Sequence, residues 1–394
     1  MKVYLDNNAT TRLDDEVFKD MVPYLTEYYG NASSLHIFSK ETTLAMNNSR
    51  ETIANILEIS PDEFIFTGSG SEADNLAIRG IAKAYKNRGK HIIASPIEHP
   101  AIKNTLQDLI DDGYDVTILP VDKNAVVDIK ALKDAIRDDT ILITVMHANN
   151  EVGTFQPIEE IAKIAKENKI IFHVDAVQTM GKVPIKPKEI GIDLLSFSGH
   201  KFYGPKGIGG LYWRNGVRFG SILTGGNQEN HRRPGTSDVA SMVGIASALK
   251  KAVSNLKEEF QKEEQLRDYF EDEISKKISE IIVNSKDVKR LPGTSSITFK
   301  YLEGESILLS LSVKGIAVSS GSACSSDELQ ASHVLLAMGI EPKFAHGTIR
   351  FSLGKYNTKE EIDYTINTLV EIIERLRNIS PLWNEFKNEN KERI

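Results

Sequence analysis

Cysteine is almost missing from this 394-residue sequence, which contains Cys324 and no other. A lone cysteine excludes a disulfide within the chain and any metal site built from several thiolates. It also leaves one thiol whose purpose has to be explained. Such a residue is more often an inert buried side chain than a nucleophile, so its neighbours in the sequence must decide between the two.

The sequence also lacks long apolar runs and an excess of positive charge. No stretch reaches the ~18 continuous apolar residues of a membrane span, and the first residues, Met1–Asp6, turn polar at once. We therefore expect a cytoplasmic protein with no signal peptide and no membrane contact. Lys and Arg number 48 against 55 Asp and Glu, a net charge of −7, so no general surface for nucleic acid is expected.

The order of the expected elements predicts an α/β protein. Apolar runs that are typical of buried strands alternate with helical patterns over Asp115–Pro120, Ile129–Ile136, Ile141–Met146, Ile158–Asn168 and Ile170–Asp175. This alternation predicts a mainly parallel central sheet with helices on both faces.

The chain length suggests two domains, because a domain usually has ~100 to 200 residues. A long helical pattern from Val239 to Ile281 is interrupted near Ser254, and its later half is heavily charged. We place the domain boundary there. We expect a large α/β domain over residues 15–258 and a small α+β domain formed by residues 1–14 and 259–394.

Two side chains follow neighbouring strands and are expected to meet. The strand Ile170–Asp175 ends in an acid, and the run Leu194–Phe197 is followed by Lys201. Ligands of open α/β sheets bind outside the carboxyl ends of the strands. The pair could be a buried ion pair, or a lysine and a carboxylate that hold the aldehyde and the pyridine nitrogen of pyridoxal phosphate (PLP). Lys206 competes with Lys201 as the amine.

A glycine-rich turn offers a seat for a phosphate. Gly68–Asn75 leads from the strand Glu63–Thr67 into a helix, whose free backbone N–H groups attract anions, and Ser71 is expected to cap this helix. The same residues fit the dinucleotide fingerprint G-x-G-x-x-A. That fingerprint requires an acid ~20 residues later, and the strand His91–Ser95 ends without one. Phosphate is the better ligand.

Further candidate residues lie in loops or on a later strand. His99 follows a strand and precedes Pro100, and Asn150 lies in the loop after Met146. Arg350, on the strand Thr348–Ser352, could clamp a carboxylate bidentately or form an ordinary ion pair.

His173 and Asp175 share a strand face and leave an iron site as an outside alternative. No H-E-x-x-H pair is present, and we expect no metal.

The neighbours of Cys324 are small and hydrophilic. The stretch Ser319–Glu328 is rich in serine and contains Gly321, whereas an inert core cysteine would have apolar neighbours. The surroundings therefore favour an accessible, nucleophilic thiol.

Together these motifs resemble the NifS/IscS-type cysteine desulfurases, a class V aminotransferase-like branch of the fold-type I PLP enzymes. The resemblance is carried by Asp175–Gln178, Ser198–Lys201, Gly204–Gly207 and Ser319–Cys324, the last typical of the longer-loop class. It covers nearly the whole chain. Two departures are Ser325–Ser326, where Thr-Ser is common, and the turn at Gly68, where Ser-Gly-x-Thr is common; both keep hydroxyl and glycine chemistry.

The resemblance implies a role for each candidate residue. PLP would be bonded to Lys201, with Asp175 on its pyridine nitrogen and His99 stacked on its ring as a proton shuttle. Arg350 would bind the substrate α-carboxylate, with Asn31 near it. The other cofactor contacts implied are Gly70, Ser71, Asn150, Gln178, Ser198 and His200, with Thr236 reaching the phosphate of the other subunit of a homodimer.

The implied reaction removes sulfur from L-cysteine. It gives L-alanine and a persulfide on Cys324, which passes to acceptor proteins such as an iron–sulfur scaffold of the IscU/NifU type, or serves tRNA thiolation. A class V aminotransferase, a selenocysteine lyase and a non-catalytic sulfur-transfer scaffold are the alternatives. The sequence does not choose among the acceptors.

Overall fold

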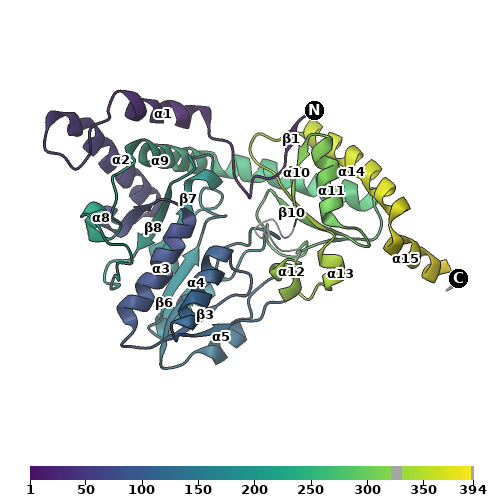
Figure 1. The fold of residues 1–394 in the computed structure, drawn as a ribbon, viewed down its shortest axis with the longest axis horizontal. Coiled ribbons are helices and arrows are strands. Elements are labelled where there is room, and N and C mark those ends of the chain that lie inside the picture. Colours follow the sequence, from purple (N-terminus) through teal and green to yellow (C-terminus); the bar gives the residue numbers. More distant parts are fainter. Residues whose placement is uncertain (321–330, 392–394) are drawn as a thin grey trace.

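The computed structural model describes residues 1–320 and 331–391, and its centre is a seven-stranded sheet (Figure 1). The strand order is β2-β8-β7-β6-β5-β3-β4, with β8 antiparallel to both neighbours and the other pairs parallel. The strands are β2 (Phe64–Thr67), β3 (His91–Ala94), β4 (Asp115–Ile118), β5 (Thr140–Thr144), β6 (Ile171–Asp175), β7 (Leu194–Ser198) and β8 (Gly209–Trp213). The predicted mainly parallel sheet is confirmed.

Helices cover both faces of this sheet. Successive side chains of a strand point to opposite faces, so Phe172 joins one apolar cluster and Ile171 another. The first cluster contains side chains of α1, α2, α6 and α9, and the second contains those of α3 and α4. The helices of this part are α1 (Asp15–Thr26), α2 (Lys40–Leu57), α3 (Gly70–Tyr85), α4 (Pro100–Asp111), α5 (Ile129–Ala135), α6 (Ile158–Glu167), α7 (Pro187–Ile190), α8 (Gln228–His231) and α9 (Val239–Ser254).

The start of α3 corrects one prediction. Ser69, not Ser71, caps this helix: its side chain accepts the backbone N–H of Glu72 at 3.0 Å. Ser69 has the extended backbone of an N-cap residue, whereas Ser71 already lies in the first helical turn. The glycine turn is therefore tighter than the sequence suggested.

A second, antiparallel sheet has the order β12-β13-β10-β9 and its own apolar cluster. Its strands are β9 (Ile281–Val283), β10 (Thr294–Phe299), β12 (Ser319–Ser320) and β13 (Thr348–Ser352). The surrounding helices are α10 (Leu256–Lys277), α11 (Gly304–Val313), α12 (His333–Ala337), α13 (Pro342–Ala345), α14 (Lys359–Ile379) and α15 (Pro381–Lys391). The chain start joins this part, because β1 (Val3–Tyr4) pairs in parallel with β11 (Ile316–Ala317) and Leu5 packs in the same cluster.

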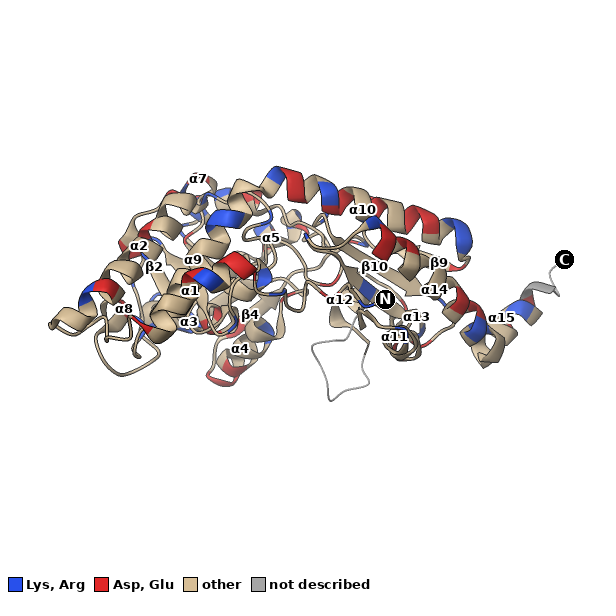
Figure 2. Cartoon of the chain, turned by 90° about the horizontal axis from the view of Figure 1, so that it is seen from above, with Lys and Arg blue, Asp and Glu red and all other residues tan. Residues whose placement is uncertain are grey.

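The predicted interruption of the long helix is present. α9 ends at Ser254 and α10 begins at Leu256. Lysines, arginines and acids alternate along α10, and most of these charges face solvent (Figure 2). We retain the division at residue 258 as a proposal. Within the described ranges, no helix is long and apolar enough to cross a bilayer.

Candidate active site

A cavity of about 400 Å³ opens at the carboxyl ends of β6 and β7. It brings together ten residues predicted from the sequence: Gly70, Ser71, His99, Asn150, Asp175, Gln178, Ser198, His200, Lys201 and Arg350. Other side chains of its wall were not singled out from the sequence: Asp6, Asn8, Ala9, Ser69, Asp74, Met146, Val177 and Ser319. Segments from both sheets and from the chain start therefore form one cavity.

Asp175 and Lys201 lie at the carboxyl ends of neighbouring strands, as predicted from the sequence. Asp175 is the last residue of β6, and its Oδ1 accepts the N–H of Val177 at 2.8 Å. Burial raises the pKa of Asp175 to about 6, although the Val177 N–H and the Lys201 charge act to lower it. Lys201 ends a short 3-10 helix after β7, and its Nζ donates to the carbonyl oxygens of Asn8 at 2.6 Å and Ala9 at 2.8 Å.

A second carboxyl group lies close to Asp175. Asp74, on α3, is buried, and its Oδ1 has no hydrogen-bond partner among the described residues. Burial, and then the negative charge of Asp175, raise the pKa of Asp74 well above its usual value. Burial and the Asp175 charge therefore favour the neutral form of Asp74, which leaves Asp175 as the better place for the negative charge of the pair.

His99 is held by the helix that it caps. Its Nδ1 accepts the N–H of Ala101 at 3.1 Å, so a neutral ring carries its proton on Nε2. Burial, with the charge of Lys201 as the next cause, lowers the pKa of His99 to about 4. The ring is therefore neutral at pH 7 and lines the cavity.

The His173 side chain makes its contacts inside the central sheet and does not line the cavity. Its ring nitrogens contact the hydroxyls of Thr144 at 2.8 Å and Ser196 at 2.9 Å, and burial lowers its pKa to about 3. Within residues 1–320 and 331–391, no group of three His, Cys, Asp or Glu side chains could hold a metal ion.

The loop after β1 supports several groups of the site. The carbonyl of Asn8 accepts the Gln178 Nε2–H at 3.0 Å as well as the Lys201 amine. The Asn8 amide donates to Thr294 Oγ1 at 2.8 Å and to the Asn150 carbonyl at 3.1 Å. By its residue types alone this loop is a polar stretch, and although it resembles the amino-terminal signature of the desulfurases, its partners could not be predicted because they lie far along the chain.

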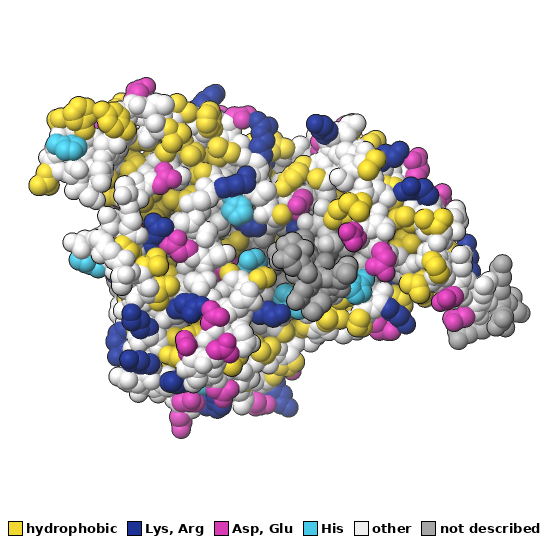
Figure 3. Space-filling model, viewed as in Figure 1, with side chains coloured by type: hydrophobic (Ala, Val, Ile, Leu, Met, Phe, Trp, Pro, Cys, Tyr) yellow, Lys and Arg dark blue, Asp and Glu magenta, His cyan; other side chains and the backbone are white. Residues whose placement is uncertain are grey.

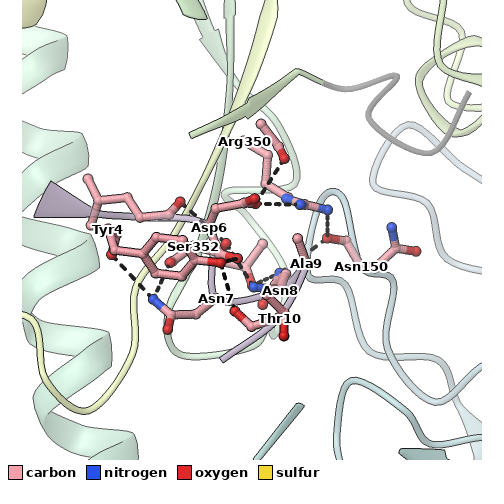
Figure 4. A network of polar contacts seen from close by, with 12 residues as sticks. Tyr4, Asp6, Asn7, Asn8, Ala9, Thr10, Asn150, Arg350 and Ser352 are labelled. Atoms are coloured by element: carbon pink, nitrogen blue, oxygen red, sulfur yellow. Dashed lines mark hydrogen bonds and ion pairs between the residues drawn. The ribbon is translucent and has the colours of Figure 1, made fainter. Parts of the chain in front are cut away.

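Arg350 enters the cavity from β13 (Figure 4). Its Nη1 donates to the Asn150 carbonyl at 3.1 Å and its Nη2 to Asp6 Oδ1 at 2.9 Å. The predicted alternatives, an ion pair and a carboxylate clamp, are thus not exclusive: Arg350 has a partner and still faces the cavity. The sequence placed Asp6 in a stretch that resembles the amino-terminal signature of the desulfurases but indicated no role for it.

Two predicted residues that the structure describes are not part of this cavity. Asn31 and Thr236 are exposed and absent from its wall; the Asn31 carboxamide instead accepts the N–H of Ser33 at 2.9 Å. Cys324 lies outside the described residues. Ser319, five positions before it in the sequence, pairs with Arg350 across β12 and β13.

Residues 3–365 match the family described as "Aminotransferase class-V". The protein is a member of the class V aminotransferase family. It is 49% identical to the cysteine desulfurase IscS of Dictyoglomus turgidum over 390 residues, which cover 99% of each chain. It is 48% identical to the cysteine desulfurase IscS of Methanosarcina thermophila over 380 residues, covering 96% of this chain and 94% of the relative.

The chain is also similar to solved structures. A "NIFS-LIKE PROTEIN" superposes with a TM-score of 0.90 at 40% identity, covering 95% of this chain and all of that one. The apo cysteine desulfurase of Thermococcus onnurineus superposes with a TM-score of 0.85 at 27% identity, covering 95% of both chains. These findings confirm the fold-type I prediction and a PLP-dependent enzyme.

The cavity has the features that PLP requires. Its volume is within the ~300 to 1,000 Å³ of small-molecule sites, and the Lys201 amine and the Asp175 carboxylate both line it. A Cβ on Gly70 would come within 2.8 Å of Val177 Cγ2, so glycine allows the start of α3, with its free backbone N–H groups, to pack against Val177 at the cavity wall. The buried Gln178 Oε1 has no hydrogen-bond partner among the described residues.

Glu98, beside this site, should give the fold a pH dependence. Its Oε1 accepts the Met146 N–H at 2.9 Å and the Ser95 hydroxyl, whereas its Oε2 has no partner in the described part of the chain. Burial raises its pKa from 4.5 to about 8. Between these values the folded protein holds a proton that the unfolded chain has lost, so the free energy of unfolding falls as pH rises.

We therefore expect Glu98→Gln to flatten the pH dependence of stability. From about pH 6.5 to about pH 8.5 this one group should cost the parent on the order of 2 kcal/mol, and glutamine has no such proton to lose. Denaturant unfolding at the two pH values measures the difference. An equal pH slope in parent and variant would show that Glu98 is ionised in the folded protein.

Proposed function

We propose that this protein is a cysteine desulfurase: L-cysteine and the Cys324 thiol are converted to L-alanine and a Cys324 persulfide. The observation that carries this proposal is one cavity lined by Asp175 and Lys201, which follow strands of the central sheet, and by Arg350 of β13, in a chain 49% identical to a cysteine desulfurase. The sulfur atom leaves the substrate Cβ, which gains a proton, and forms a sulfur–sulfur bond with Cys324. Atoms and electrons balance without an outside oxidant.

The roles of the cofactor-binding residues follow from their positions. PLP, when bound, supplies an electron sink for the charge that develops at the substrate Cα. Asp175, ionised at pH 7, would hold the pyridine nitrogen in its protonated form. The residues proposed for the phosphate are Gly70, Ser71, Ser198 and His200, and those proposed for the ring are His99, Asn150 and Gln178.

Three residues are proposed to act on the substrate. Lys201 takes the proton from Cα, and Arg350 binds the α-carboxylate through its guanidinium. His99 carries its proton on Nε2 and can donate a hydrogen bond from this atom to a reacting group. Its low pKa means that it does not hold a second proton at neutral pH.

A homodimer is part of the proposal. Apolar side chains gather over the segment from α1 to α2, at the upper left of Figure 3. The exposed side chains there are Phe18, Leu25, Tyr29, Leu35, Ile37, Phe38 and Leu44. Apolar patches of this kind are typical of protein–protein interfaces. Thr236, exposed within one chain, is proposed to reach the phosphate of the partner chain; Asn31 has no support from the cavity of its own chain and stays a prediction.

The dimer can be tested by complementation. Lys201→Ala and Thr236→Ala chains are inactive or weakened alone, but a mixed dimer has one site with both wild-type residues if Thr236 acts in trans. Recovery of activity on mixing is therefore expected. Lack of recovery, with mixed dimers present, contradicts the role in trans.

The acceptor and the location complete the proposal. The persulfide would pass to an iron–sulfur scaffold of the IscU/NifU type or to tRNA thiolation, as expected of the family. A cytoplasmic location suits a thiol that must stay reduced between turnovers.

The test of the function is a product assay with L-cysteine. The holoenzyme should form alanine and sulfide in equal amounts when a reducing thiol is present. Pyruvate or a transaminated product in place of alanine would contradict the proposal and favour an aminotransferase.

A further inference from the structure

Asp6 connects two strands of the cavity wall to the chain start. Its Oδ1 accepts a hydrogen bond from Arg350 Nη2 at 2.9 Å (Figure 4) and another from Ser319 Oγ at 2.8 Å. Ser319 and Arg350 are direct partners across β12 and β13. The Asp6 carboxylate therefore binds both the Arg350 guanidinium and the Ser319 hydroxyl. All three residues line the cavity.

The donors of Arg350 are only partly used. The Asn150 carbonyl takes an N–H of Nη1 and Asp6 takes one of Nη2. The buried Nε has no hydrogen-bond partner among the described residues. A planar guanidinium held at both terminal nitrogens cannot rotate to satisfy Nε elsewhere, so this donor is left for a ligand.

The charge of Asp6 also explains how the Arg350 guanidinium can stay buried at the cavity before a ligand binds. The Arg350 side chain is 4% exposed, and its ion pair is with Asp6. A buried guanidinium without a counter-ion would be costly and would tend to move toward solvent. Holding it in place beforehand lowers the ordering cost of binding.

We propose that Asp6 is a positioning residue, which orients Arg350 so that its remaining N–H groups receive the α-carboxylate of the substrate. This inference rests on the proposed function, because it takes L-cysteine as the substrate. Asp6 itself acts through Arg350, to which it supplies both a hydrogen-bond acceptor and a counter-charge.

The matched variants are Asp6→Ala and Asp6→Asn in the holoenzyme. Alanine removes the acceptor and should raise KM for L-cysteine about tenfold, with kcat within about twofold, which is the size expected for one hydrogen bond to a charged group. Asparagine keeps an oxygen acceptor for Nη2 but not the charge, so it should restore only part of the loss. Asp108→Ala removes an exposed Asp–Arg pair with Arg79 and should leave KM unchanged.

Cysteamine, which is cysteine without its carboxylate, separates positioning from general damage. Its dissociation constant, measured from the absorption change of the bound cofactor, should be equal in the parent and in Asp6→Ala. The dissociation constant of L-cysteine should be about tenfold weaker in the variant.

Three results would overturn the proposal: unchanged L-cysteine binding in Asp6→Ala, equal weakening of L-cysteine and cysteamine, or no recovery in Asp6→Asn. A parent enzyme that fails to convert L-cysteine would instead refute the proposed function, so the two failures are told apart.

Discussion

Lys201→Ala is expected to stop turnover of L-cysteine, with a loss of about a thousandfold or more, as for the removal of other covalent catalytic groups. The amine is the proposed attachment point of the cofactor and the proposed base. Its removal also leaves the carbonyls of Asn8 and Ala9 without a donor that they have in the parent. Initial rates of alanine formation, with circular dichroism to verify folding, measure the effect.

Lys206→Ala is the matched control for this experiment. Lys206 lies five positions away in an exposed turn and is absent from the cavity wall. It should retain the parent rate and the absorption of the bound cofactor. The assignment of Lys201 is wrong if the two variants exchange these outcomes.

Cys324→Ala is the second large effect that we expect. The variant should still bind cofactor and L-cysteine, because the described wall of the cavity is unchanged. Sulfide release and persulfide formation should fall by about a thousandfold or more, because no thiolate remains to attack the substrate sulfur. Rapid-mixing absorption measures substrate binding, and a sulfide assay measures turnover.

Ser325→Ala, at the next position, is the control for a general effect of changing this segment. It should keep the parent rate of sulfide release. An aminotransferase would not need the thiol, so full turnover in Cys324→Ala would remove the desulfurase reaction from consideration and favour that alternative.

The sequence predicted the central sheet well because buried parallel strands leave a plain signal. Runs such as Ile141–Met146 are apolar except for Thr144, since both of their faces are covered. The positions of Asp175 and Lys201 followed from the rule that parallel strand ends meet at one edge. Those predictions needed only local patterns and one topological rule.

Contacts between distant segments were not predictable in the same way. Asp6 and Arg350 are 344 positions apart, and nothing in either local pattern indicates the pair. The burial of Asp74 could not be predicted either, because an aspartate in a helical pattern is ordinarily exposed. The cap of α3 was misplaced by two residues, since Ser69 and Ser71 are both capping residue types and only the backbone conformation separates them.

The most direct test of the account is a single turnover of the holoenzyme with L-cysteine, without reductant or acceptor, followed by peptide mass analysis. The account predicts one alanine per active site and one added sulfur atom on the peptide that contains Cys324. Two results would contradict it. One is alanine formed without the added sulfur on this peptide, and the other is added sulfur on the corresponding peptide of the Cys324→Ala variant.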